Sequence, residues 1–111
     1  MHLELEPEVE EWLGGLAAGE FGTVAFHLDR LVERGAQLRM PHSRALGEGL
    51  FELRFDLGRV AQRITYFFAG GDRIVLLTVF RKQRMNEAQE IKRARRAMKR
   101  CVDEQHTAED D

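Results

Sequence analysis

The sequence is poor in cysteine and proline. Cys101 is the single cysteine among 111 residues and there are only two prolines, which excludes an internal disulfide and a Pro-rich linker. The four histidines are scattered and no Cys/His cluster has the spacing of metal ligands, so we expect no metal and no other cofactor. Even the apolar run at residues 74–77 is too short to span a membrane, and the N-terminus has no signal-peptide pattern. We therefore expect a cytoplasmic protein without a membrane partner.

Charge, by contrast, is plentiful and unevenly distributed. Residues 1–34 hold two arginines against eight acidic residues, whereas residues 35–102 hold fifteen Lys and Arg against six acidic residues. Residues 103–111 carry five acidic side chains and no Lys or Arg. We expect a single domain over 1–102 and an acidic, disordered tail over 103–111. A basic middle between acidic ends favours contact with a polyanion, although solvated charged faces also occur in proteins that bind none.

The first third of the chain has helical periodicity after a short alternating segment. Residues 2–5 alternate polar and apolar side chains and predict a short strand. A one-sided apolar stripe over residues 9–16 predicts a helix that ends near Gly19, and a second stripe over 21–32 predicts a helix capped by Gly35. We expect the two helices to form a hairpin with both stripes facing one partner.

From residue 50 the period changes to two. Residues 50–56 and 60–68 predict two strands joined by a turn, and residues 74–80, apolar nearly throughout, predict a central strand. Asn86 and Gln89 have the spacing of a capping box and predict a last helix with basic exposed sides. The order predicts an α+β domain in which a short strand and a two-helix hairpin pack on a twisted antiparallel sheet. A C-terminal helix completes the domain, and the opposite face of the sheet is expected to be partly open.

Cations on neighbouring strands are the first candidates for a functional site. By alternation Arg54 points away from the apolar face of its strand, and Arg63 does so on the next strand. Arg81, Lys82 and Arg84 follow the central strand. Cations brought together across strands repel one another unless an anion lies between them, so we expect a phosphate site. Pairing of these cations with nearby acids or with water is the alternative.

Four motifs occur in the order and at the spacing of the RelE/ParE toxin superfamily. Residues 39–54 resemble its segment of a Pro, a Leu, a Gly-Leu and a Glu-Leu-Arg, and residues 63–66 resemble its Arg-Ile-x-Tyr. Residues 76–82 are similar to its Leu-Leu, two positions and Phe-x-Lys, and residues 90–94 to its Glu-Ile-x-x-Ala. Over residues 36–98 the chain resembles the HigB-like branch, and the two-helix start agrees with the RelE-like fold.

The resemblance implies a toxin of a type II toxin–antitoxin system. Such a protein is a metal-independent endoribonuclease that cleaves mRNA on the ribosome and so inhibits translation. The 2′-hydroxyl would attack the scissile phosphate, giving a 2′,3′-cyclic phosphate. By resemblance Arg63 and Lys82 hold that phosphate, and Arg54 positions it or a neighbouring one. The implied partners are the ribosome with its mRNA, and a helix-turn-helix, HigA-like antitoxin.

Further RNA contacts are expected from residues near these three cations. They are Arg81, Gln83, Arg84, Tyr66, His42, Lys92 and Arg96. Tyr66 faces away from Arg63 by strand parity and is more simply a core residue, and His42 is more simply an exposed loop histidine. Lys92 and Arg96 suit an rRNA contact and the solvated face of a helix equally well.

One position departs from the pattern of the family. Gln83 stands where the family has a second Lys after the Phe, so the site lacks a charge that Arg81 or Arg84 is expected to supply. The departure favours an alternative function, a non-catalytic binding protein. Such a protein is a ParE-like inhibitor of gyrase, or a decayed toxin that acts only through its antitoxin.

A small RNA-binding module is a third alternative. It needs exposed aromatic side chains on adjacent strands, on which bases can stack. Phe51, Phe55, Tyr66 and Phe68 are the aromatic residues of these strands. Because they are expected on the buried side of the sheet, the sequence disfavours this alternative.

Overall fold

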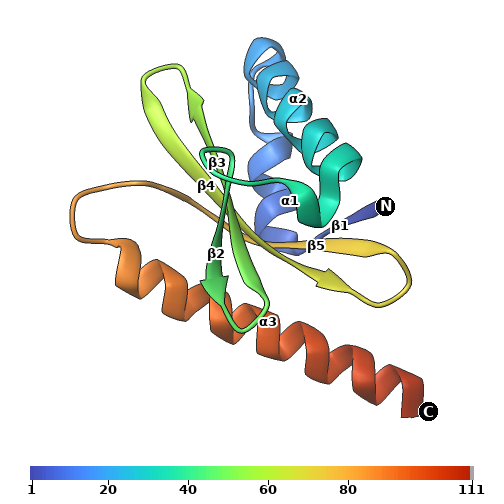
Figure 1. Ribbon diagram of the computed structural model, residues 1–111. Helices are drawn as coiled ribbons and strands as arrows, with labels where there is room; N and C mark the ends of the chain where they lie inside the picture. The colour runs from blue at the N-terminus through green and yellow to red at the C-terminus, as the bar shows by residue number, and fades with distance from the viewer. Residues whose placement is uncertain (111) are drawn as a thin grey trace.

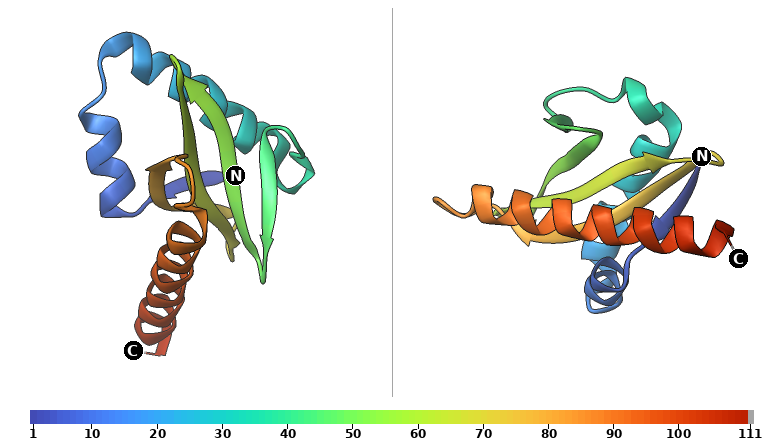
Figure 2. Two further views of the ribbon diagram at one scale, coloured as in Figure 1. Left: turned by 90° about the vertical axis from the view of Figure 1, so that its left-hand side faces the viewer. Right: turned by 90° about the horizontal axis from the view of Figure 1, so that it is seen from below.

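A five-stranded sheet carries helices on both of its faces (Figures 1 and 2). The computed structural model describes the backbone of residues 1–110 and the side chains of residues 1–104. In chain order the elements are β1 (His2–Leu5), α1 (Pro7–Gly14), α2 (Ala18–Arg34), the 3₁₀ turn η1 (Gly35–Gln37), β2 (Ser43–Gly47), β3 (Leu50–Leu57), β4 (Val60–Ala69), β5 (Arg73–Arg81) and α3 (Glu87–Asp110). Among the described residues, none of the helices has the length and apolar character that a membrane span requires.

The strand order is β1-β5-β4-β3-β2. The predicted α+β class is confirmed, but the sheet is mixed, because β1 runs parallel to β5 while the other neighbours are antiparallel. Local periodicity shows that a strand exists and not which distant strand it pairs with. The edge strand β2 was not expected at all, since its sequence Ser-Arg-Ala-Leu-Gly contains none of the strong strand formers.

The two N-terminal helices pack on one face of the sheet, as the two stripes predicted. Val9 of α1 and Val24, Leu28 and Leu31 of α2 share a core with the apolar sides of β3, β4 and β5. The first helix ends at Gly14 and not near Gly19, which lies inside α2. The paired glycines at 14 and 15 interrupt the helix, and α2 restarts where the Glu20 carboxylate accepts a hydrogen bond from the backbone of residue 17.

The last helix, α3, covers the opposite face, which was expected to be partly open (Figure 2). Ala94 and Ala97 are buried against Phe67, Val75 and Leu77 in a second core. These alanines let α3 approach the sheet closely. Because two small residues give only a weak apolar stripe, the sequence did not predict that α3 packs on this face. The backbone stays helical to Asp110, although a disordered tail was expected from residue 103. The side chains of that tail after residue 104 lie outside the described part.

Polar anchors fix α3 on the sheet at two places. Arg93 donates hydrogen bonds to the Glu8 carboxylate of α1 and, at 3.2 Å, to the carbonyl oxygen of Val79. Arg95 donates to the carbonyl oxygen of Leu46 at 2.7 Å and so ties α3 to the last residues of β2. The middle of α3 is therefore held against the sheet beside the ends of β2 and β5.

We predict that filling the contact between α3 and the sheet destabilises the protein. Ala94→Leu puts a larger side chain where there is no space, and overpacking costs about 1–3 kcal/mol. Ala88→Leu, on an exposed side of the same helix, is the matched control and should change the free energy of unfolding by less than about 0.5 kcal/mol. Urea unfolding measures both. Equal stability of the two variants would show that α3 does not pack on the sheet in solution.

Candidate functional site

Two arginines lie directly opposite each other on neighbouring strands. Arg54 of β3 pairs with Arg63 of β4 in the register of the sheet, and both side chains lie on the face covered by α3, which we call the α3 face. The side chain of Arg63 is buried, whereas that of Arg54 is 23% exposed. Like charges directly opposite in an antiparallel pair destabilise it. The pair therefore requires a compensating anion.

A buried carboxylate supplies that anion. Glu52, two residues before Arg54, is only 1% exposed. One of its oxygens lies 3.8 Å from Arg54, 3.9 Å from Arg63 and 3.9 Å from Arg44 of β2. These distances are too long for hydrogen bonds. Burial raises the pKa of Glu52, nearby Glu87 raises it further, and the three arginines oppose the shift.

A second carboxylate connects the ends of two strands. Glu87, the first residue of α3, accepts a hydrogen bond from Arg44 Nη1 at 2.9 Å and lies 3.4 Å from the ammonium of Lys82. Lys82 follows β5, and its backbone N–H bonds to the carbonyl oxygen of Ala61. Four cations, Arg44, Arg54, Arg63 and Lys82, thus surround two carboxylates. We call these six residues the cationic cluster.

The cationic cluster has an excess of positive charge and is partly open to solvent. Burial, with a further contribution from Arg54, lowers the pKa of Arg63, yet an arginine stays protonated at neutral pH. Its position is fixed because Arg63 Nη1 donates to the carbonyl oxygen of Gln62 at 2.9 Å. Lys82 is 38% exposed and Arg44 is also accessible. Fixed cations beside accessible ones are suited to binding a phosphate group.

The fold brings together the three cations that we expected to act together, Arg54, Arg63 and Lys82. The other residues predicted to contact RNA are dispersed. Arg81 is exposed on the opposite face of the sheet, where it lines a hollow with Trp12 of α1. Gln83 and Arg84 are exposed in the loop that leads to α3.

Tyr66, also predicted as an RNA contact, lies away from the cationic cluster. It is 1% exposed, packs in the core beneath α1 and α2, and its hydroxyl lies 2.5 Å from Ser43 Oγ. The interpretation as a core residue, also drawn from strand parity, agrees with this position.

His42 belongs to a separate group beside α2. Its Nε2 lies 3.3 Å from Arg30 Nη1, and the other terminal nitrogen of Arg30 lies 2.8 Å from His27 Nδ1. The ring of His27 stacks on Phe55 with centroids 4.9 Å apart. Burial, Arg30 and His42 lower the pKa of His27, so this ring favours the neutral form. The group is held together by Arg30, which donates to both histidine rings.

Lys92 and Arg96 lie on the exposed outer side of α3, in line with both interpretations of them. The sequence analysis missed two members of the cationic cluster, Arg44 and Glu87. Glu52 shares a strand face with Arg54 by alternation, and it is one of the nearby acids that the pairing alternative allowed. Arg44 lies on the strand that was not predicted, and Glu87 enters through a loop whose path no local pattern gives.

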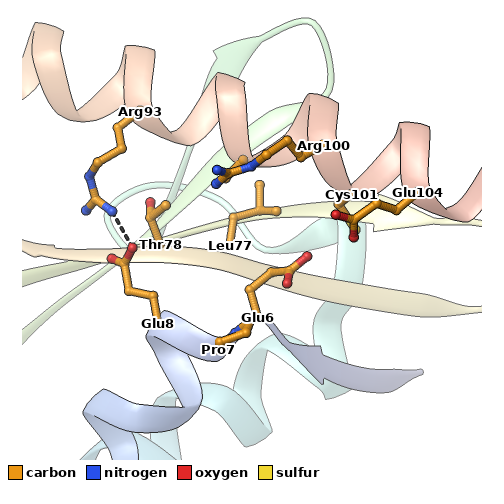
Figure 3. Close-up of a pocket in the computed structure, with 10 residues that line it drawn as sticks. Glu6, Pro7, Glu8, Leu77, Thr78, Arg93, Arg100, Cys101 and Glu104 are labelled. Atoms are coloured by element: carbon orange, nitrogen blue, oxygen red, sulfur yellow. Dashed lines mark hydrogen bonds and ion pairs between the residues drawn. The ribbon is translucent and has the colours of Figure 1, made fainter.

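Other chemistry on the molecule is limited. Among the described residues, no three His, Cys, Asp or Glu side chains are placed to hold a metal ion. A hollow of about 390 Å³ lies between the start of α1 and α3, beside the ion pair of Glu8 and Arg93 (Figure 3). Cys101 lines it, and burial together with Glu6 raises the pKa of this thiol to about 11. A thiol that stays protonated is a poor nucleophile, so we assign Cys101 no chemistry.

Comparison with known proteins supports this architecture. The family described as "Phage derived protein Gp49-like (DUF891)" matches residues 11–99. A chain in the crystal structure of the intact E. coli RelBE toxin–antitoxin complex is similar in fold, with a TM-score of 0.57 and 13% sequence identity, over 75% of this chain and 98% of that chain. No curated protein sequence gives a significant match. The predicted RelE-like fold is thereby confirmed.

We predict that the protein loses stability as the pH falls below the ordinary His pKa of 6.5. Because the pKa of His27 is lowered in the folded state, the unfolded chain binds a proton first, and protonation then favours unfolding. Urea unfolding as a function of pH should give a shallower dependence for His27→Gln than for the wild type. His2→Gln, at an exposed histidine, is the control and should keep the wild-type slope. An unchanged slope in His27→Gln would contradict the assignment.

Proposed function

Because the chain belongs to the phage-derived Gp49-like (DUF891) family of HigB-like toxins, we propose that it is the toxin of a type II toxin–antitoxin system. Its activity is that of a metal-independent endoribonuclease that cleaves mRNA on the ribosome. The observation that carries the proposal is the pairing of Arg54 with Arg63 beside Lys82 on an accessible part of the α3 face. Four cations of α3, Arg93, Arg96, Lys99 and Arg100, also line one hollow, but they all belong to a single helix. The cationic cluster instead draws its cations from β2, β3, β4 and the segment after β5.

The reaction is an attack of the 2′-hydroxyl on the adjacent phosphate. It forms a 2′,3′-cyclic phosphate and a free 5′-hydroxyl, and negative charge accumulates on the phosphate oxygens in the transition state. The fixed guanidinium of Arg63 and the ammonium of Lys82 stabilise that charge, because their positions require little reorganisation during the reaction. Arg54, which is partly exposed, orients the scissile phosphate or the next one along the strand.

The neutral Gln83 does not remove the required charge. Arg81 cannot replace it, because Arg81 lies on the other face of the sheet. Arg44 supplies a further cation from β2 instead, and it is accessible beside Lys82 through their common contact with Glu87. This arrangement favours the ribonuclease over a decayed toxin.

We predict that Lys82→Ala removes most of the activity while Arg81→Ala leaves it intact. The two residues are adjacent in sequence, but only Lys82 lies in the cationic cluster. Loss of one group that stabilises the transition state costs on the order of 10²–10³-fold in rate. After induction in cells, mapping of mRNA 5′ ends should give new ends for the wild type and for Arg81→Ala, and few for Lys82→Ala.

The same experiment separates the functions. Growth inhibition without new mRNA 5′ ends would overturn the proposed ribonuclease activity and would support the alternative of a ParE-like inhibitor of gyrase. Equal loss of cleavage in the two variants would mean that the cationic cluster is not the site.

The antitoxin is the second part of the proposal. A nuclease that cuts the mRNA of its own cell must be produced with an inhibitor, here a HigA-like helix-turn-helix protein. The acidic helices α1 and α2 pack on the face opposite the cationic cluster and do not suit contact with rRNA. We therefore assign α1 and α2 to the contact with the antitoxin. An antitoxin bound there leaves the cationic cluster uncovered and inhibits the toxin by making the complex too large to enter the ribosome.

We predict that reversing two charges on α1 weakens the complex. Glu10 and Glu11 are exposed, and the double substitution Glu10→Lys, Glu11→Lys should lower the affinity by at least about tenfold at low salt. Lys82→Ala should bind the antitoxin as tightly as the wild type. Calorimetric titration measures both, and the reverse pattern would mean that the antitoxin covers the cationic cluster.

A further inference from the structure

The proposed reaction needs a group that takes the proton from the attacking 2′-hydroxyl, because the alkoxide is a far better nucleophile than the alcohol. The usual candidates are a histidine and a tyrosine. His42 is engaged with Arg30 beside α2, and Tyr66 is buried on the opposite face of the sheet. The backbone of His42 bonds to Arg54, but neither side chain is directed to the cationic cluster.

Two carboxylates remain among the described residues of the cluster. Both oxygens of Glu52 are buried and its side chain is 1% exposed, so it cannot touch an RNA bound from solvent. Its role is to hold Arg54 and Arg63 in place. Glu87 is 30% exposed and lies at the first position of α3, on the side where the cluster is open. Of the two carboxylates in the cationic cluster, Glu87 is therefore the accessible proton acceptor.

We propose that Glu87 is the general base of the reaction and works with Lys82, an inference that rests on the proposed function. In the protein without RNA, Arg44 and Lys82 hold the carboxylate between them. The Glu87 carboxylate accepts only one hydrogen bond from Arg44, whereas a phosphodiester can present two oxygens to the planar guanidinium and so competes for it. Binding of RNA draws Arg44 to the phosphate and leaves the Glu87 carboxylate free beside Lys82.

The proton transfers then balance. The 2′-hydroxyl proton passes to the Glu87 carboxylate as the O2′–P bond forms. The P–O5′ bond breaks, and O5′ takes a proton from the Lys82 ammonium and leaves as a hydroxyl. The protonated Glu87 returns its proton to the Lys82 amine across the contact that measures 3.4 Å between Oε2 and Nζ. Both side chains are restored to their starting charges.

The test is the pH dependence of cleavage under single-turnover conditions, with the protein in excess over ribosomes carrying a synthetic mRNA. A carboxylate base loses activity when it is protonated, so the wild-type rate should fall toward acid pH. Glu87→Gln should cleave about 10²-fold more slowly at neutral pH and lose this acid limb. Glu87→Asp should keep the acid limb at a reduced rate. Ribosome binding should be unchanged or tighter in Glu87→Gln.

Glu90→Gln is the matched control. Glu90 lies one turn further along α3 and pairs with Arg93, so this variant should cleave like the wild type with the same pH profile. Thermal melting checks that each variant is folded. Cleavage by Glu87→Gln at the wild-type rate or faster, with the acid limb intact, would overturn the inference and make Glu87 a carboxylate that merely competes with RNA. A wild-type protein that leaves the mRNA uncut would instead overturn the proposed function.

Discussion

The pairing of Arg54 with Arg63 across β3 and β4 is the constraint on which the site depends. The apolar side of the same strands imposes it, because Leu53 pairs with Ile64 and Phe51 stacks on Tyr66. A shift of the register by one residue would turn those core side chains outward. The core beneath α1 and α2 therefore fixes two like charges opposite each other on the α3 face, at an electrostatic cost that the folded chain has to offset.

Glu52 offsets that cost within the protein only in part. It contacts the arginines at ion-pair distances and not through hydrogen bonds, so the guanidinium groups keep the capacity to bind a further anion. A closely hydrogen-bonded carboxylate would neutralise the pair and leave a purely structural ion cluster. The loose contact is therefore compatible with the phosphate binding that we propose for this site.

Much of the fold could be predicted from the sequence, because it depends on local periodicity. The stripes of α1 and α2 and the alternation in β3 and β4 gave both the elements and their buried sides. Pairing between distant segments could not be predicted in this way, as the parallel partner of β1 and the weak strand β2 show. The same distinction between local patterns and long-range pairing applies to the residues of the site. Arg54 and Arg63 follow from alternation, whereas Arg44 and Glu87 come together only through the edge strand and the path of the loop before α3.

The position of α3 decides how much of the α3 face stays open. Its two alanines and its anchor through Arg93 keep its middle against β5, while its first residue ends beside the cationic cluster. A helix that began one turn later would remove the hydrogen bond that Arg44 makes to Glu87 and leave Arg44 with the longer contact to Glu52. The loop after β5 thus sets the opening of the site. Gln83 is exposed in that loop, and its backbone N–H donates to Asn86 Oδ1 just before α3.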